Sequence, residues 1–441
     1  MTQKLFKTIL LSLVFSTVSL YAQEGFSDIF GVDKTEEKPL ETNDTVTFDI
    51  SGNVGCIQDF FFDKELSSER IARPFASLNI HASAPSVQAK MDLRIKDIGD
   101  FSIAELYLRG FFSFGYFDSG FIKKEWGKGD GVHVIDPLNP LDQSAGISSD
   151  LNEMKKAEFM LAWNQYLGEN ALLEIVYKPF YTPLITSTEG RWVIADISLF
   201  PDIQPPPNTK DWKYTQLATR LSGSFLRIDA GLLYYYGYFS EPGAQIITKF
   251  TGSNPMDPAD YTTSTHWTYT KAQLVGAEAV GVLGPFTLRG EMGYWFSEDR
   301  TGTIEHLYND RLVWLGGIDY LLGSNFFISV QEYGHYIMNY TNATAQDVNR
   351  GLSYKNQASL NNLILAIEGT FFNEQLKLRL SGLTLLGTKG YVLMPEISWF
   401  VTDNWEIALK GKLFDGEKAG NNPYYAWKNN DSLSLLVSFT F

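Results

Sequence analysis

The chain has 441 residues, a formal net charge of −15 and a single cysteine, Cys56. This acidic balance argues against nucleic acid as a partner, because binding phosphates requires a basic surface that releases counterions. One cysteine also excludes an internal disulfide. Aromatic residues make up 15% of the chain, yet the mean hydropathy is only −0.13. That combination is typical of strands with one apolar face and one wet face.

The amino-terminal residues have the features of an export signal. Lys4 and Lys7 give a basic start, an apolar run follows, and a small-residue site ends at Ala22. We therefore expect residues 1–22 to be a signal peptide. The acidic stretch that follows, 23–44, is expected to be a periplasmic leader.

A membrane location, if there is one, has to be reached by strands. No later stretch has the roughly 18 consecutive apolar residues of a spanning helix. In hydrocarbon every backbone polar group must be satisfied internally, and only a helix or a closed barrel does this. A mature chain of this kind would therefore cross the membrane as a closed β-barrel.

Period-two alternation supports this interpretation along much of the chain. Residues 87–95 place Val, Ala, Met, Leu and Ile on one face and Gln, Lys, Asp and Arg on the other. Similar patterns recur at 226–233, 376–380 and 405–410. A charge at nearly every second position is costly unless that face is hydrated. We interpret the charged face as the lumen of a barrel rather than the outside of a soluble sandwich.

The carboxy-terminal run is the clearest strand. Residues 433–441 alternate apolar side chains with mostly small polar ones, and the apolar face ends at Phe441. This terminal aromatic residue resembles the recognition signal of outer-membrane proteins. The resemblance implies that Phe441 is an assembly signal and that the barrel assembly machinery is a partner.

The spacing of turns indicates an all-β transmembrane antiparallel barrel over residues 45–441, with about 18 strands and 16 as the alternative. Short periplasmic turns should alternate with longer extracellular loops. The expected turns are 84–86, 112–114, 167–170, 222–224, 283–285, 322–325, 372–374 and 401–404. The longest loops are expected at 127–154, 182–211, 240–269 and 340–358. Alternation is weakest at 104–117 and 272–282.

A barrel of this size leaves a lumen wide enough for water, so its inward side chains decide what passes. The pore-lining candidates are Lys90, Arg94, Arg109, Arg220, Arg227, Arg289, Glu291, Lys377, Arg379, Lys410 and Lys412. Two interpretations stay open. These charges either pair across neighbouring strands and hydrate the wall, or form opposing sectors whose transverse field orients polar solutes. We expect Lys377, Arg379, Lys410 and Lys412 to form one basic sector.

The first long loop contains the most distinctive sequence motifs. Residues 124–130 read Lys-Glu-Trp-Gly-Lys-Gly-Asp, and 136–142 read Asp-Pro-Leu-Asn-Pro-Leu-Asp. Glycine and proline set sharp turns, so we expect a compact loop. The passage resembles a porin-like family of bacterial outer-membrane β-barrels in which a strand ending in Trp-Gly is followed by Asn-Pro-x-Asp. The resemblance implies a loop folded into the pore and shaped by Trp126, Asp130, Asp136, Asn139 and Asp142. An ordinary surface loop is the alternative.

Signals for chemistry are weak. His81-Ala82-Ser83 resembles the His-x-Ser spacing of outer-membrane phospholipases, but it lies beside an expected turn and no orienting group follows. The other histidines lack the spacing of zinc ligands. We therefore expect no catalytic residue, no metal and no cofactor.

Together these patterns favour a bacterial outer-membrane channel for passive diffusion of small hydrophilic solutes, surrounded by outer-membrane lipid. The principal rival is a transporter of hydrophobic ligands, similar to the fatty-acid channel family, with the amino-terminal segment plugging the lumen. A surface adhesin acting through its long loops is a third hypothesis. The charged inward faces disfavour the hydrophobic route.

Overall fold

The computed structural model describes residues 46–62, 68–97, 100–148, 151–194, 201–344, 347–352, 357–418 and 422–441. The expected signal peptide, 1–22, and leader, 23–44, lie outside the described residues.

The strands of the first half are β1 (Thr47–Phe62), β2 (Ser68–Ala84), β3 (Val87–Asp97), β4 (Asp100–Phe112), β5 (Gly115–Ile122), β6 (Glu158–Tyr166), β7 (Ala171–Lys178), β8 (Gln216–Phe225), β9 (Ile228–Tyr238), β10 (Gly243–Phe250) and β11 (Tyr261–Thr268). Those of the second half are β12 (Lys271–Leu283), β13 (Phe286–Ser297), β14 (Arg311–Leu322), β15 (Phe326–Ile337), β16 (Ser359–Phe371), β17 (Leu376–Leu386), β18 (Gly390–Phe400), β19 (Trp405–Gly416) and β20 (Ser432–Thr440). Short helices lie in the connections: η1 (Leu151–Met154), η3 (Trp212–Tyr214), η4 (Pro258–Asp260), η5 (Tyr340–Asn342), η6 (Val348–Leu352) and α2 (Pro423–Ala426).

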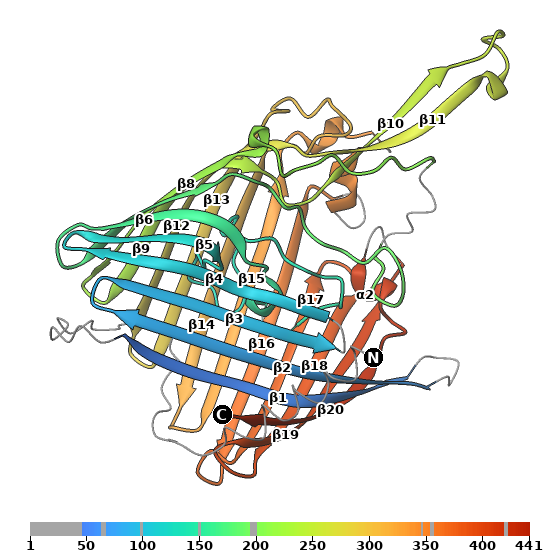
Figure 1. Ribbon diagram of the computed structural model, residues 1–441. Helices are drawn as coiled ribbons and strands as arrows, with labels where there is room; N and C mark the ends of the chain where they lie inside the picture. The colour runs from blue at the N-terminus through green and yellow to red at the C-terminus, as the bar shows by residue number, and fades with distance from the viewer. Residues whose placement is uncertain are drawn as a thin grey trace, which may run out of the picture. The chain divides into compact units, whose positions relative to one another are not determined.

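Eighteen of these strands form one closed antiparallel barrel (Figure 1). Each strand pairs with its neighbours in the chain, β9 pairs with β12, and β1 pairs with both β2 and β20. The expected strand number and fold class are therefore confirmed. The remaining pair, β10 and β11, forms a separate hairpin that extends from one end of the barrel (Figure 1).

Connections differ at the two ends of the barrel. One end, called the turn end, has the tight connections 85–86, 113–114, 167–170, 284–285, 323–325, 372–375 and 401–404, close to their expected places. The other, the loop end, has the long connections 123–157, 179–215, 239–270 and 338–358, and also 298–310 and 417–431, which were not expected to be long.

One expected turn was wrong. Residues 222–224 continue β8, and the chain reverses at Leu226 and Arg227. Their φ angles are 52° and 79°, as in the mirror-image turns whose twist matches that of antiparallel strands. Arg227 is exposed on this turn. Its assignment to the pore lining was therefore wrong too.

The outward face of the barrel is apolar. On β17, β19 and β20 the outward residues include Leu380, Ile407 and Leu435, with exposed fractions of 42%, 43% and 40%. Aromatic rings gather toward the turn end, where Trp405 packs on Phe439 at 5.1 Å between ring centroids. An apolar band flanked by aromatic rings matches the lipid-facing surface of a transmembrane barrel. Within the described residues, none of the helices is long and apolar enough to span a membrane.

Candidate pore and inner loop

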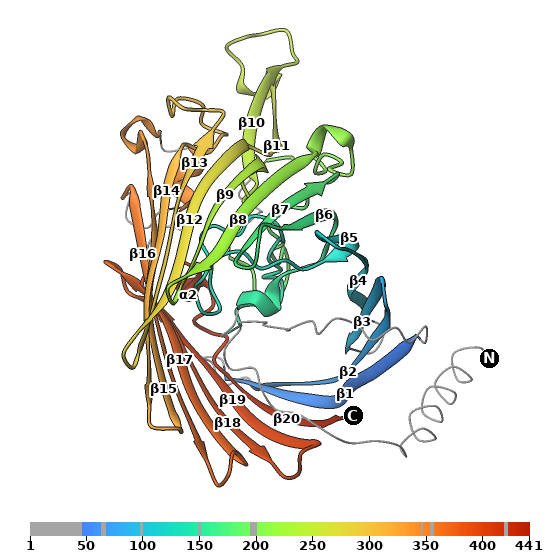
Figure 2. The same cartoon turned by 90° about the vertical axis from the view of Figure 1, so that its left-hand side faces the viewer.

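The connection between β5 and β6, residues 123–157, is called the inner loop because it runs inside the ring of strands (Figure 2). Its side chains Trp126, Ile135 and Leu138 have no exposed surface. They belong to one apolar cluster with wall residues such as Met160 on β6 and Leu274 on β12. Burying these side chains favours the folded-in position of the loop.

Asn139 holds the two ends of the inner loop together. Its Nδ2 donates hydrogen bonds to the carbonyl oxygens of Ile122, at 2.9 Å, and Lys156, at 2.8 Å. Its Oδ1 accepts from the backbone N–H of Lys124 at 2.8 Å. One buried amide thus ties the end of β5 to the start of β6 and satisfies three backbone groups.

Asp136 and Trp126 stabilise the middle of the loop. Asp136 Oδ2 accepts the backbone N–H of Trp126 at 3.2 Å and lies 2.5 Å from Lys155 Nζ. Asp142 lies 2.9 Å from Lys156 Nζ. These contacts act within the loop.

Glu291 on β13 attaches the loop to the wall. Its Oε1 accepts the backbone N–H groups of Lys128 and Gly129 at 2.7 Å each, and its Oε2 accepts that of Val134 at 2.8 Å. Glu291 Oε1 also lies 3.0 Å from His133 Nδ1. A carboxylate that receives several N–H groups makes strong, charge-assisted bonds.

Two further wall residues hold the same stretch. Glu278 on β12 accepts the backbone N–H of Gly127 at 2.7 Å. The amide of Gln331 on β15 both accepts from the N–H of Asp130, at 2.9 Å, and donates to its carbonyl, at 2.8 Å. At Gly127, whose φ is +110°, a Cβ would come within 2.5 Å of Glu291 Oε1. Glycine is required there because the backbone lies so close to the wall.

His133 completes the attachment between the loop and β13. Its Nε2 lies 2.9 Å from Glu125 Oε1, while its Nδ1 faces Glu291. Desolvation lowers the pKa of His133, but the hydrogen bonds to Glu125 and Glu291 and the charge of Glu291 outweigh it and raise the pKa to about 9. The imidazole is therefore protonated at neutral pH, and a positive charge on the loop faces a buried negative charge on the wall.

Of the five loop residues expected from the sequence, Trp126, Asp136 and Asn139 lie within the folded loop. Asp130 is exposed, although its backbone is bound to Gln331. Asp142 forms an ion pair with Lys156 and a β-bridge with Ile185 of the next long connection.

Most of the expected wall charges are in ion pairs. The pairs are Lys90–Glu105 (2.6 Å), Arg94–Asp92 (2.9 Å), Arg109–Asp118 (2.7 Å), Arg289–Asp319 (2.6 Å), Lys377–Glu368 (2.9 Å) and Lys410–Glu396 (3.0 Å). Arg220 lies 2.7 Å from Glu278, and Glu291 is only 3% exposed. These two residues face inward but lie beneath the inner loop, where they are shielded from open water.

A cavity of about 730 Å³, called the lumen cavity, remains between the inner loop and the wall. Its lining comes from β1, β2 and β17–β20 on the wall side. On the loop side it comes from Ser144, Ala145, Ser148 and Glu153 of the inner loop and from Ser187 and residues 189–192 of the connection between β7 and β8. The charged residues that line it are Asp59, Arg73, Glu153, Glu189, Arg191, Arg379, Glu396, Lys410 and Lys412.

Three of the four residues expected to form a basic sector lie together here: Arg379, Lys410 and Lys412. Lys377 lies outside the cavity lining and pairs with Glu368. Lys412 Nζ donates to the carbonyl of Ile147 on the loop at 2.7 Å. Among the residues that the structure describes, Arg379 has neither an ion pair nor a hydrogen-bond partner for its side chain.

Sequence reasoning missed two of the residues that position the loop. Glu278 and Gln331 were not among the candidates, although both stand at inward, alternating positions of their strands. The signal that could have found them is a large polar side chain on an inward face crowded with small residues, such as Gly276 on β12. Their loop partners are 151 and 201 residues away in the chain.

Comparison with known proteins finds similar structures but no similar sequences. No family model matches the sequence, and no curated protein sequence matches it. Among solved structures, OccK5 (OpdH) from Pseudomonas aeruginosa matches 90% of this chain and 98% of its own, with a TM-score of 0.50 and 12% identity. OccK11 (OpdR) of the same organism covers 90% of this chain and 96% of its own, with a TM-score of 0.49 and 7% identity. At such identities the likeness to OccK5 shows a shared barrel fold.

Proposed function

We propose that this chain is a porin-like channel of the bacterial outer membrane through which small hydrophilic solutes diffuse passively. The observation that supports it best is the lumen cavity of about 730 Å³, lined with charged side chains, inside a closed barrel of 18 strands. A closed barrel pairs its backbone groups internally, and its apolar outward face suits lipid. By this proposal the turn end is periplasmic and the loop end extracellular.

The inner loop would set the size of solute that passes. An 18-stranded barrel without a loop inside has a wide aqueous interior. Glu278, Glu291 and Gln331 each bind the backbone of the loop, so the loop is held by three strands of the wall, β12, β13 and β15. We infer a fixed constriction rather than a gate that opens with each solute.

The wall and loop charges would orient polar solutes in the lumen cavity. Arg379, Lys410 and Lys412 come from the wall, whereas Glu153 and Glu189 come from loop segments. The wall also contributes Arg73, Asp59 and Glu396, and the loop segments also contribute Arg191, so the wall side is net positive and the loop side net negative. Such a difference produces a field across the pore, which a dipolar solute follows. Arg379, whose guanidinium has no ion pair or hydrogen bond among the described residues, belongs to the basic side.

The porin-like family resemblance forms part of this proposal. In the structure β5 ends at Ile122, so Trp126 and Gly127 lie in the inner loop rather than at a strand end. By the resemblance they fit the loop against the wall, and Asn139 of the Asn-Pro-x-Asp segment closes its base. The rival route for hydrophobic ligands is less well supported. A hydrophobic solute that passes through the lumen cavity would have to desolvate its cationic groups, which is unfavourable.

Ion selectivity tests the proposal. Replacing Lys377, Arg379, Lys410 and Lys412 with Gln keeps four long polar side chains but removes four positive charges. Because a pore focuses the field of its wall charges, the variant should select cations more strongly than the wild type. The measurement is the reversal potential across a planar bilayer under a KCl gradient, at low and high salt, since screening weakens the effect.

Two results would count against the proposal in different ways. If the folded wild-type protein conducts no ions, the channel function is wrong and the plugged transporter gains support. If it conducts but the quadruple variant has the wild-type reversal potential at low salt, these residues do not line the limiting section.

A further inference from the structure

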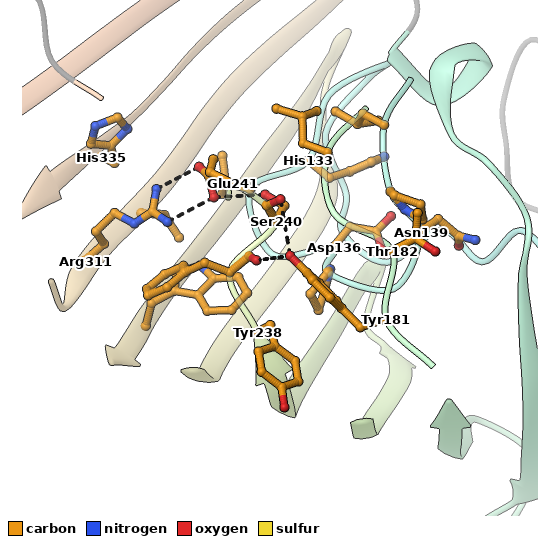
Figure 3. A pocket seen from close by; sticks show the side chains of 18 of the residues that line it. His133, Asp136, Asn139, Tyr181, Thr182, Tyr238, Ser240, Glu241, Arg311 and His335 are labelled. Carbon is orange, nitrogen blue, oxygen red and sulfur yellow. Dashed lines mark hydrogen bonds and ion pairs between the residues drawn. The ribbon is translucent and has the colours of Figure 1, made fainter. Parts of the chain in front are cut away.

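A second cavity, of about 260 Å³, is called the side cavity (Figure 3). Residues 133–141 of the inner loop line one side of it. The rest of the lining comes from residues 181–184 and 238–241 of two long connections, from Lys178 on β7 and Gln216 on β8, and from the ends of β13–β16 nearest the loop end. No residue lines both cavities.

The charges around the side cavity are already neutralised. Arg311 binds Glu241 with both guanidinium nitrogens, at 3.0 and 3.2 Å (Figure 3). Desolvation raises the pKa of Glu241, but the charge and hydrogen bonds of Arg311 outweigh it and lower that pKa to about 2. Asp136 pairs with Lys155 at 2.5 Å. His133 lies between two carboxylates, as described above.

Lys178, the remaining charge of the lining, is also held. Its Nζ donates to the carbonyl of Leu138 and lies 3.7 Å from Glu158. An ionic solute in the side cavity would therefore meet no unpaired countercharge, and it would lose its own hydration. This contrasts with the lumen cavity, where Arg379 has no partner among the described residues.

Neutral polar groups, in contrast, are available. Among the residues that the structure describes, the side chains of Thr182, Trp295 and Asn362 make no hydrogen bond, although all three line the side cavity. They offer a hydroxyl, an indole N–H and a carboxamide, which together donate and accept. Asn362 is only 8% exposed, so its side chain is largely shielded from bulk water.

Aromatic rings form the other part of the lining. Trp295 packs on Phe239 at 5.0 Å between ring centroids. Tyr181 donates from its hydroxyl to the Phe239 carbonyl at 2.6 Å, and Tyr238 donates to the Lys213 carbonyl at 2.9 Å. Both hydroxyls are thus committed to the protein, and the rings, which are only 3% and 5% exposed, form part of the apolar lining. Such surface suits the apolar face of a sugar ring.

We propose that the side cavity is a binding subsite for one uncharged, polyhydroxylated ring, of the size and chemistry of an aldopyranose. The volume equals about nine water molecules at about 30 Å³ each, which accommodates one such ring. Ring hydroxyls would bond Thr182, Asn362 and the Trp295 indole N–H, while the aromatic surface would cover a C–H face. The inference rests on the proposed function, because it names a solute class that the channel would retain near its loop end.

The test is equilibrium binding of glucose to the purified, folded protein in detergent, measured by saturation-transfer difference NMR, which does not require conduction. Gluconate and glucosamine are matched charged probes of similar size. Glucose should bind at least about fivefold more tightly than either, since an ion finds no unpaired charge in the cavity. In Asn362→Leu, which keeps the side-chain volume, glucose should bind about three- to tenfold more weakly, as expected for one or two lost hydrogen bonds.

Asn254→Leu, the same substitution in the exposed tip of the β10–β11 hairpin, is the matched control and should bind glucose like the wild type. Heat-modifiable migration shows whether each variant is folded. If Asn362→Leu does not fold, Thr182→Val takes its place. The comparison of the three probes on the wild type still tests whether the side cavity prefers an uncharged ring.

Absence of glucose binding, equal or tighter binding of gluconate, or undiminished binding by folded Asn362→Leu would overturn the inference. A bilayer recording of the same preparation separates this from the channel proposal. Ion conduction without glucose binding refutes the subsite alone, whereas glucose binding without conduction refutes the channel alone.

Discussion

The attachment of the inner loop to β13 can be tested at Glu291. Its carboxylate accepts three backbone N–H groups, from Lys128, Gly129 and Val134, and also faces the protonated ring of His133. Gln in its place keeps the volume and one acceptor oxygen, but loses the negative charge and presents an NH₂ group to N–H donors. We therefore expect Glu291→Gln to loosen this part of the loop while the barrel stays closed.

The loss of free energy of loop attachment follows from the number of N–H donors that lose an acceptor. Each buried donor left without a partner costs about 1–3 kcal/mol, and about two of the four donors facing Glu291 would be affected. A loss of about 3 kcal/mol changes the ratio of attached to detached loop by roughly 150-fold. Trp126, Ile135 and Leu138 remain buried against the wall, so detachment should be partial and transient rather than complete.

Single-channel recording is the assay. Glu291→Gln should give a higher mean conductance and more current noise than the wild type, because the loop leaves the narrow section for part of the time. Glu169→Gln, at an exposed position in a turn between β6 and β7, is the matched control and should record like the wild type. If folded Glu291→Gln has wild-type conductance and noise, Glu291 does not hold the loop in the limiting section.

Three further predictions concern pH, assembly and topology. The folded-state pKa of His133, about 9, exceeds its ordinary value of 6.5, so its contribution to loop attachment is complete below about pH 6.5 and is lost as pH rises through 9. Current noise should therefore increase between pH 7 and pH 10 in the wild type but not in His133→Gln, and equal pH dependence in both would contradict this. Deletion of Phe441 should lower the amount of heat-modifiable barrel in the outer membrane, and normal insertion would argue against an assembly signal. In Cys56→Ser protein, a cysteine at Asn254 should react with an impermeant maleimide on whole cells, whereas one at Asn373 should react only after the outer membrane is opened; the reverse would invert the orientation.

Alternation predicted the barrel wall well because every strand separates two different solvents. Residues 433–441 and 87–95 each have one apolar face and one polar face, and in the structure these faces point outward and inward as expected. Even 272–282, where small residues blur the pattern, forms β12. There the glycines leave room for Ile135 of the inner loop, since a Cβ on Gly276 would lie 3.2 Å from its Cγ2.

Local sequence was a poorer guide where the backbone acts against residue preference. Ser222 and Gly223 have the composition of a turn, yet they continue β8, and the chain reverses at Leu226 and Arg227 with positive φ angles. Register with β9 decides this, because Leu221 pairs with Leu232 and places both outside. A two-residue mirror-image turn then follows without glycine.

In the candidate site, too, the sequence predicted local features but not contacts between distant segments. Turn chemistry pointed to the segments 124–130 and 136–142, because glycine, proline and asparagine act locally. The choice of Glu278, Glu291 and Gln331 as attachment points depends on contacts across more than 150 residues of chain. Likewise, pairing of the wall charges is a matter of register between strands, which alternation alone does not set.

The most direct test of the central claim is whether the purified, heat-modifiable wild-type barrel conducts ions in a planar bilayer. An aqueous lumen beside the inner loop predicts discrete single-channel steps whose size rises nearly in proportion to the KCl concentration at high salt, where the field of the wall charges is screened. Repeated insertion of folded protein without any such steps would contradict it.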